Sequence, residues 1–399
     1  MNTTKKAILN SDEVRQQYLN VYENTEIKIS DIPKLITFNT HFVGNPFMEI
    51  LGNSDEAYHV EFYDNDELIH SSDLSCNMWT KAHRKYYTDW KILVKNQNGE
   101  LIHEENLNLE GKRVYIALDS KSLGDTIAWI PYFEEFRKKH NCDLIASTFW
   151  NNFFIDSYPN IKFVNPGIGV DNLYAMYLIG WFYDESSEPE LPNTIPLQKT
   201  ATNILGLEYK EIKPIISHTK KSVVYDYYNK PIKEKYVTIA ATSTAQLKFW
   251  NNKTGWEEVV KFLNDNGYRV INVSNEGCDI KGVEQLKDYS IKNTMNIILN
   301  SEFFIGLSSG LSWLAWALNT KVVMISNFTD ENHEFTSDCI RVTNKSVCNS
   351  CWNKSEHKFD KGDWNWCPLH KGTDRQFECH TSITGNMVIN ELKNLINGN

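Results

Sequence analysis

Four cysteines near the C-terminus have a spacing suited to metal binding. They follow the pattern C-x2-C-x15-C-x11-C, at Cys348, Cys351, Cys367 and Cys379. Four thiolates brought together suit a tetrahedral, thiophilic ion, and zinc fits this spacing. His370 follows Cys367 at a ligand-like spacing and could replace Cys379, although four sulfurs are the favoured set. We therefore predict a structural metal finger over residues 345–382.

A carboxylate that could act as a general base follows a predicted strand. Residues 113–118 form an apolar run typical of a buried strand, and Ser122-Leu-Gly124-Asp125 is the turn after it. Gly124 permits a tight turn, and the strand end directs Asp125 into the crevice where such sheets bind ligands. Asp125 could there accept a proton from a hydroxyl group. The alternative is an aspartate that only caps a helix, which is the commoner role for this pattern.

A second candidate group follows the predicted strand 236–241. It combines hydroxyl side chains with a lysine and a tryptophan, at Thr242, Ser243, Thr244, Lys248 and Trp250. Hydroxyls and a lysine beyond a strand end suit a nucleotide diphosphate, and the lysine could neutralise charge on a phosphate leaving group. A polar loop with a solvated lysine explains the same residues equally well.

A third candidate is the glycine and serine turn that opens the predicted helix 311–318. Its residues are Ser308, Ser309, Gly310 and Leu311. Free backbone N–H groups and the positive end of the helix dipole would make an anion site there. The alternative is an ordinary capped helix in the core, because the full Gly-x-Gly-x-x-Gly spacing is missing.

The elements that must position these residues fall into successive regions. Residues 1–109 are β-rich, with a hairpin signal at Asn98-Gly99. Strands then alternate with helices over residues 110–230 and again over 231–344, which predicts an α/β fold of two parallel, Rossmann-like domains facing a cleft. The metal finger follows, and residues 383–399 close the chain with a helix.

Single residues mark the expected helix boundaries. Pro131 should kink or delay the helix after the Asp125 turn. Thr254 is the expected N-cap of a helix that Gly267 ends.

Composition restricts the compartment and the partners. The net charge of −10 argues against nucleic acid or an anionic membrane as the main partner. The stretch 303–320 is too short and too polar for a membrane span. The first 17 residues lack the apolar segment of a secretory signal, so we expect a cytoplasmic protein. In that reducing compartment clustered cysteines favour metal over disulfides, and the four scattered ones are expected to be small buried residues, at Cys76, Cys142, Cys278 and Cys339.

These motifs together resemble the ADP-heptose-dependent heptosyltransferases. In that superfamily a Gly-Asp after the first strand supplies the catalytic base, and a Thr-rich strand end with Lys and Trp binds the donor phosphates. An Asp-Thr-Gly-Leu-Ser-His turn of the lipopolysaccharide enzymes corresponds to Ser308-Ser-Gly-Leu-Ser-Trp313. The sequence departs from that turn at the Asp, Thr and His positions, which puts a lipopolysaccharide acceptor in doubt.

Longer segments are similar to the bacterial autotransporter heptosyltransferase family. They are residues 246–256, 303–317 and 366–379. The similarity runs from about Gly111 to the C-terminus and, more loosely, over the N-terminal β region. The resemblance implies a GT-B glycosyltransferase with a β-rich N-terminal domain. It also implies iron at the four-cysteine finger, no catalytic metal, and a ring-shaped homo-oligomer.

The resemblance implies an inverting transfer of heptose from ADP-heptose to serine hydroxyls of an autotransporter adhesin passenger. Asp125 would be the base, and Lys248 would stabilise the departing ADP. The expected donor-binding residues are Ser243, Thr244, Lys248, Trp250, Ser308, Ser309, Gly310 and Leu311. One alternative is a heptosyltransferase that acts on lipopolysaccharide or another saccharide. Another is a non-catalytic adaptor that recognises a partner through its metal knuckle and β domain.

Overall fold

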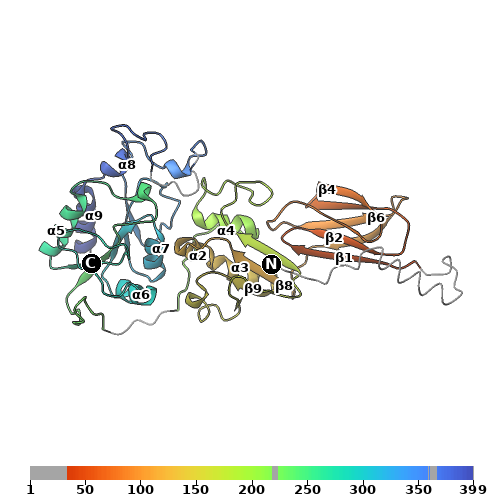
Figure 1. Ribbon diagram of the computed structural model, residues 1–399, viewed down its shortest axis with the longest axis horizontal. Helices are drawn as coiled ribbons and strands as arrows, with labels where there is room; N and C mark the ends of the chain where they lie inside the picture. Colours follow the sequence, from red (N-terminus) through yellow and green to blue (C-terminus); the bar gives the residue numbers. More distant parts are fainter. Residues whose placement is uncertain (1–33, 218–222, 358, 360–365, 399) are drawn as a thin grey trace.

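The computed structural model describes residues 34–217, 223–357, 359 and 366–398 (Figure 1). The N-terminal segment in which we expect no secretory signal lies outside them. The molecule is elongated, with the β-rich region at one end and an α/β domain with the cysteine finger at the other (Figure 1). A further α/β domain lies between them. No described helix is both long enough and apolar enough to cross a membrane.

The β-rich region contains two layers of antiparallel strands. One is a four-stranded sheet in the order β4(Glu67–Leu74)-β3(Tyr58–Asp64)-β6(Trp90–Lys95)-β7(Leu101–Asn106). The pairing of β6 with β7 confirms the predicted hairpin. The other layer is β1(Ile36–Val43)-β2(Phe47–Gly52)-β5(Met78–Lys81). It is not separate from the next domain, because β1 pairs in parallel with β11 (Ala175–Ile179). The sequence did not predict this continuity.

The middle domain has the predicted alternation of strands and helices. Its parallel strands follow the order β10(Lys162–Phe163)-β9(Asp143–Ser147)-β8(Arg113–Leu118)-β11. Its helices are α2 (Leu123–Trp129), α3 (Pro131–His140) and α4 (Leu197–Leu205). Pro131 is the first residue of α3, so the expected interruption of the helix is confirmed.

The second α/β domain has a five-stranded parallel sheet. Its order is β13(Arg269–Asn272)-β12(Tyr236–Ile239)-β14(Phe304–Leu307)-β15(Val322–Ile325)-β16(Cys339–Val342). Its larger helices are α5 (Gly255–Asp265), α6 (Ile291–Leu299), α7 (Gly310–Ala317) and α9 (Gly385–Asn397). Strands β12, β14 and β15 are buried along their whole length, as expected for a parallel sheet covered by helices on both faces.

The N-terminus of α5 is capped differently from the prediction. Thr254 does occupy the N-cap position, but its hydroxyl donates to the Glu258 side chain at 2.6 Å. The backbone N–H of Gly255 instead donates to Asn252 Oδ1 at 2.9 Å. Asn252 therefore satisfies the free helix N–H group that we assigned to Thr254.

Helices α2 and α7 pack against each other and join the two α/β domains (Figure 1). Each helix begins just beyond the carboxyl end of a strand, α2 after β8 and α7 after β14. In open α/β sheets ligands bind at these strand ends. The contact between α2 and α7 therefore brings the predicted base and the predicted anion site to one place.

Candidate active site

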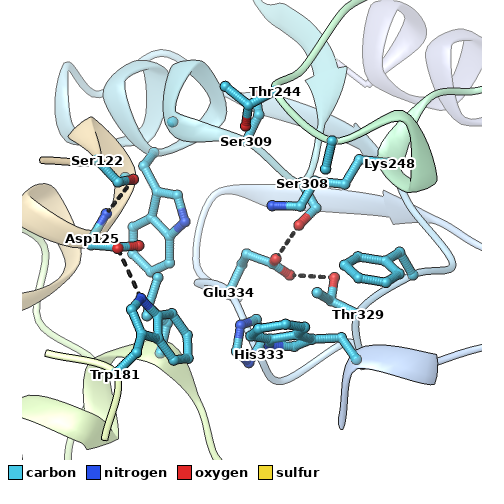
Figure 2. A pocket seen from close by; sticks show the side chains of 17 residues that line it. Ser122, Asp125, Trp181, Thr244, Lys248, Ser308, Ser309, Thr329, His333 and Glu334 are labelled. Carbon is cyan, nitrogen blue, oxygen red and sulfur yellow. Dashed lines mark hydrogen bonds between the residues drawn. The ribbon is translucent and has the colours of Figure 1, made fainter. Parts of the chain in front are cut away.

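A cavity of about 240 Å³ lies between the two α/β domains (Figure 2). Both domains contribute to its wall, so it opens at the junction of two parallel sheets. Six of the predicted site residues line it: Asp125, Thr244, Lys248, Ser308, Ser309 and Gly310.

Asp125 occupies one wall of the cavity, in the first turn of α2. Its Oδ2 accepts hydrogen bonds from Ser120 Oγ at 2.6 Å and from Trp181 Nε1 at 2.9 Å. Within the described part of the chain Oδ1 accepts none. Burial raises the pKa of Asp125, although these two hydrogen bonds and the charge of Lys248 oppose the rise. The carboxylate is therefore held in a fixed orientation and made more basic, as a general base requires.

Lys248 lies on the second domain, at the end of the short helix η3 (Gln246–Lys248) that follows β12. Burial lowers the pKa of its ammonium group, while the charges of Glu334 and Asp125 oppose the shift. Among the described residues it forms no ion pair. A desolvated cation without a partner is costly, so this lysine is suited to an anionic ligand.

The N-terminus of α7 offers further anion-binding groups next to Lys248. Ser309 is the N-cap residue, but its side chain makes no capping hydrogen bond. Its hydroxyl oxygen is buried and has no hydrogen-bond partner in the described structure. Thr244 and Gly310 line the same part of the wall. The free N–H groups, the hydroxyls and the helix dipole are together suited to binding a phosphate.

A buried carboxylate that the sequence analysis missed lies at the centre of the cavity. Glu334 accepts hydrogen bonds from Ser308 Oγ and, at 3.0 Å, from Thr329 Oγ1, as Figure 2 shows, and it pairs with Arg341. Burial opposes its ionisation, but the charges of Arg341 and His333 together with the hydrogen bonds from Ser308 and Arg341 lower the pKa of Glu334 to about 2. Glu334 is therefore a fixed negative charge close to Lys248.

Glu334 could have been found by the reasoning applied to Asp125. It belongs to the polar run 330–334, which follows the predicted strand 321–325. The carboxyl end of that strand faces the same crevice. No comparable signal marks the aromatic side of the cavity, where Trp181, Phe328 and Trp352 come from three segments far apart in the sequence.

Three predicted donor-binding residues do not line the cavity. Ser243 and Leu311 are partly buried beside residues that do. Trp250 requires a correction, because it is buried in the core of the second domain. Its Nε1 donates to the carbonyl of Ile383 at 2.8 Å, and its ring packs against Trp256. A direct contact between Trp250 and a donor is therefore not supported by this structure.

The finger cysteines lie close enough for their charges to interact, although no set of ligand atoms within 4.8 Å of one another contains all four among the described residues. Burial, a hydrogen bond with Glu378 and the charges of the other thiols raise the pKa of Cys348 to about 12. Burial and the charges of the other three raise the pKa of Cys379 to the same value. A bound cation would remove both penalties, so the donor set fits a thiophilic metal. Cys348 Sγ also lies within 4.8 Å of ligand atoms of His370 and Glu378, so a mixed ligand set is a structural alternative.

The geometry supports one kind of chemistry. A basic carboxylate on the middle domain faces an unpaired lysine and a helix N-terminus on the second domain (Figure 2). A substrate with a phosphate leaving group could bind with its phosphate on the lysine side. Its reacting carbon would then face Asp125.

Comparisons with known proteins agree with this arrangement. The profile of glycosyltransferase family 9 (heptosyltransferase) matches residues 168–367. The autotransporter heptosyltransferase Aah of Escherichia coli is 35% identical over 386 residues, which cover 92% of this chain and 95% of that protein. An inactive autotransporter heptosyltransferase, BimC of Burkholderia thailandensis, is 32% identical over 311 residues, covering 74% and 71% of the two chains.

The fold is also that of a solved relative. The iron-containing dodecameric glycosyltransferase TibC of enterotoxigenic E. coli H10407 superposes with a TM-score of 0.81 at 32% identity, covering 93% of this chain and 100% of TibC. Its complex with ADP-D-β-D-heptose superposes with a TM-score of 0.82 at 31% identity, covering 91% and 96%. The chain therefore belongs to the autotransporter heptosyltransferases within glycosyltransferase family 9, and it is a glycosyltransferase.

Proposed function

We propose that this enzyme transfers heptose from ADP-heptose to serine hydroxyls of an autotransporter adhesin, with inversion at the anomeric carbon. The observation that carries the proposal is the opposition of Asp125 to Lys248 across the cavity between the domains. The two α/β domains correspond in this proposal to the two lobes of a GT-B glycosyltransferase. TibC, which superposes over most of the chain, binds ADP-D-β-D-heptose.

The donor binds with its diphosphate on the second domain. Lys248 supplies the positive charge, and the N–H groups at the start of α7 supply hydrogen-bond donors. Thr244 and Ser309 add hydroxyls on the same wall. These groups neutralise charge that develops on ADP as it departs, which lowers the barrier most in a site shielded from water.

The acceptor hydroxyl reacts on the side of Asp125. The serine O–H gives its proton to Asp125 while its oxygen forms a bond to the anomeric carbon. The bond from that carbon to the β-phosphate oxygen breaks, and ADP leaves with the electron pair. Oδ2 of Asp125 accepts hydrogen bonds from Trp181 and Ser120, so Oδ1 is the oxygen placed to receive the proton.

The cysteine finger binds a structural metal. We infer iron, since the related TibC contains iron, although zinc is compatible with four thiolates. Four protein ligands would leave no position for a substrate, and the proton transfer above needs no metal. Cysteines kept for metal ligation also suit a reducing, cytoplasmic compartment. Because TibC is dodecameric, we infer a ring-shaped homo-oligomer for this chain.

The test is transfer of heptose to a passenger fragment, measured by intact mass. The wild-type enzyme should add heptose units to the fragment from ADP-heptose. Asp125→Asn should reduce the rate at least about 100-fold, with little change in ADP affinity, because the base acts only on the acceptor. Asp156→Asn, an exposed aspartate of the same domain, is the control.

The alternatives predict different results in transfer assays and in calorimetry. Transfer to a lipopolysaccharide saccharide but not to the passenger would replace the acceptor assignment. A chain that binds neither ADP nor ADP-heptose in calorimetry would be an adaptor. Full activity in Asp125→Asn would refute the assignment of the base.

A further inference from the structure

A small hydrophobic cluster joins the cysteine finger to the active site. Its buried members are Leu247, Phe328, Cys351 and Trp352, and Trp181, Phe359 and Phe377 pack against them. Leu247 directly precedes Lys248, and Trp181 donates its indole N–H to Asp125. The cluster therefore contacts the supports of both proposed catalytic residues.

Trp352 is the member of this cluster that reaches from the finger into the cavity. It directly follows Cys351 and lines the cavity wall. Its backbone N–H donates to the Phe328 carbonyl at 3.1 Å, and its carbonyl accepts from Asn193 Nδ2 of the middle domain at 3.0 Å. Its ring meets Trp181 edge to face, with centroids 5.4 Å apart and an interplanar angle of 81°. Trp352 is thus hydrogen-bonded to both α/β domains, and its ring packs against Trp181, which contacts Asp125.

We propose that the metal finger is a positioning element of the active site, and that Trp352 is the residue through which it acts. The inference rests on the function proposed above. Among the finger's described residues the regular elements are two short ones, η4 (Cys351–Asn353) and α8 (Glu378–Thr381). A segment with so little regular secondary structure gains part of its fixed shape from its metal. Metal binding at Cys351 therefore acts together with the hydrogen bonds of Trp352 to Phe328 and Asn193 to fix where Trp352 meets Trp181.

The consequence for the reaction concerns proton transfer. The hydrogen bond from Trp181 stabilises ionised Asp125 and so lowers its pKa against the effect of burial. If Trp352 is removed, Trp181 loses its support, the hydrogen bond weakens and the pKa of Asp125 rises. Because the base must be ionised to act, the acidic limb of the pH profile of kcat should move to higher pH.

The chain provides a matched control for this test. Trp366 directly precedes another finger cysteine, Cys367, but it is 43% exposed and its ring contacts Lys371 at 4.5 Å. Both Trp352→Ala and Trp366→Ala are measured as full-length protein for metal content, ADP affinity and the pH profile of kcat. Trp352→Ala should lose about 10- to 100-fold in kcat and shift the acidic limb upward, with metal content and ADP affinity retained. Trp366→Ala should match the wild type, and Trp352→Phe should recover part of the loss.

A double-mutant cycle tests the route through Trp181. Trp181→Phe removes the donor N–H, so it should shift the acidic limb in the same direction. Combining it with Trp352→Ala should add little, since both changes act on one hydrogen bond. Circular dichroism gives a readout independent of activity, because the electronic transitions of the neighbouring Trp181 and Trp352 rings couple and contribute to the spectrum. Chelation of the metal should change the spectrum as Trp352→Ala does, whereas Trp366→Ala should not.

Several outcomes would overturn the proposal. One is an unchanged pH profile of kcat in Trp352→Ala, and another is additive effects of Trp352→Ala and Trp181→Phe in the double-mutant cycle. A third is loss of metal from Trp352→Ala, which would show that Trp352 stabilises the fold of the finger itself. Failure of the wild-type enzyme to transfer heptose would instead refute the proposed function. The two failures are thus distinguishable.

Discussion

Gly124 of α2 and Gly310 of α7 touch across the boundary between the two α/β domains. A Cβ atom on Gly124 would lie 3.3 Å from Gly310 Cα, and a Cβ atom on Gly310 would lie 3.2 Å from the Gly124 backbone nitrogen. Both distances are tight and both involve backbone atoms, so neither neighbour can move away easily. This contact sets the spacing between Asp125 and the proposed phosphate site at the start of α7.

Gly124→Ala should therefore impair activity more than stability. Alanine favours the helix by up to about 1 kcal/mol, which offsets part of an overpacking cost of about 1–3 kcal/mol. The two domains should move apart by a few tenths of an ångström, and this displacement of the catalytic groups should lower kcat by up to about 10-fold. Thermal unfolding and transfer kinetics measure the two effects. Gly169→Ala is the control, because no atom lies within 4 Å of its added Cβ; a kcat for Gly124→Ala equal to that of this control would contradict the prediction.

Lys248→Met should weaken ADP binding. The ammonium forms no ion pair with the described residues and is partly desolvated, so its main favourable interaction in the working enzyme is with the ligand's phosphates. We expect the Kd for ADP in calorimetry to rise about 10- to 100-fold, or about 1.4–2.7 kcal/mol. The exposed Lys253→Met should bind ADP as the wild type does. Equal affinities in the two variants would show that Lys248 does not contact the donor.

The parts of this site that were predictable from sequence share one local pattern. Asp125, Lys248 and Ser309 each follow a predicted strand within a short turn, and the carboxyl ends of parallel strands gather at one edge of a sheet. Their positions after predicted strands therefore indicated that these three residues would lie close together. Glu334 follows the same rule, but it lies beyond the first turn after its strand, in the longer loop between β15 and β16.

The remaining features depend on tertiary packing that no local pattern encodes. Trp352 reaches the cavity because the finger folds back over the second domain, and β1 joins β11 across more than 130 intervening residues. Trp250 was predicted to contact the donor, but it does not line the cavity. Its place in a motif suggested a ligand contact, but its large apolar ring is buried against Trp256. A motif position alone does not tell whether a side chain faces the ligand or supports the wall behind it.

Substitution of the finger cysteines should identify the metal ligands. With four sulfur ligands, Cys379→Ser should lower the metal content per chain and the melting temperature, and His370→Ala should leave both near wild type. The proximity of His370 and Glu378 to Cys348 makes the comparison decisive. A metal content lost in His370→Ala but kept in Cys379→Ser would establish the mixed set instead. Cys278→Ser, which changes a cysteine outside the finger, is the control.

Glu334→Gln should shift the alkaline limb of the pH profile to lower pH. The charged groups that act on Lys248 are Glu334 and Asp125, which favour its protonated form, and His333, which opposes that form when charged. Removing the Glu334 charge lowers the Lys248 pKa further below its usual value. Because the protonated amine is the form that neutralises departing ADP, activity should be lost at a lower pH than in the wild type.

The same substitution breaks a buried ion pair, so stability must be separated from chemistry. Arg341 would be left without its partner, at a cost of about 3–5 kcal/mol in unfolding free energy. Adding Arg341→Met should recover much of this stability, since no guanidinium then remains buried without its carboxylate partner. The shifted alkaline limb should persist in the double variant, because Lys248 still lacks the Glu334 charge. If the limb returns to its wild-type position together with stability, Glu334 serves the fold rather than the protonation of Lys248.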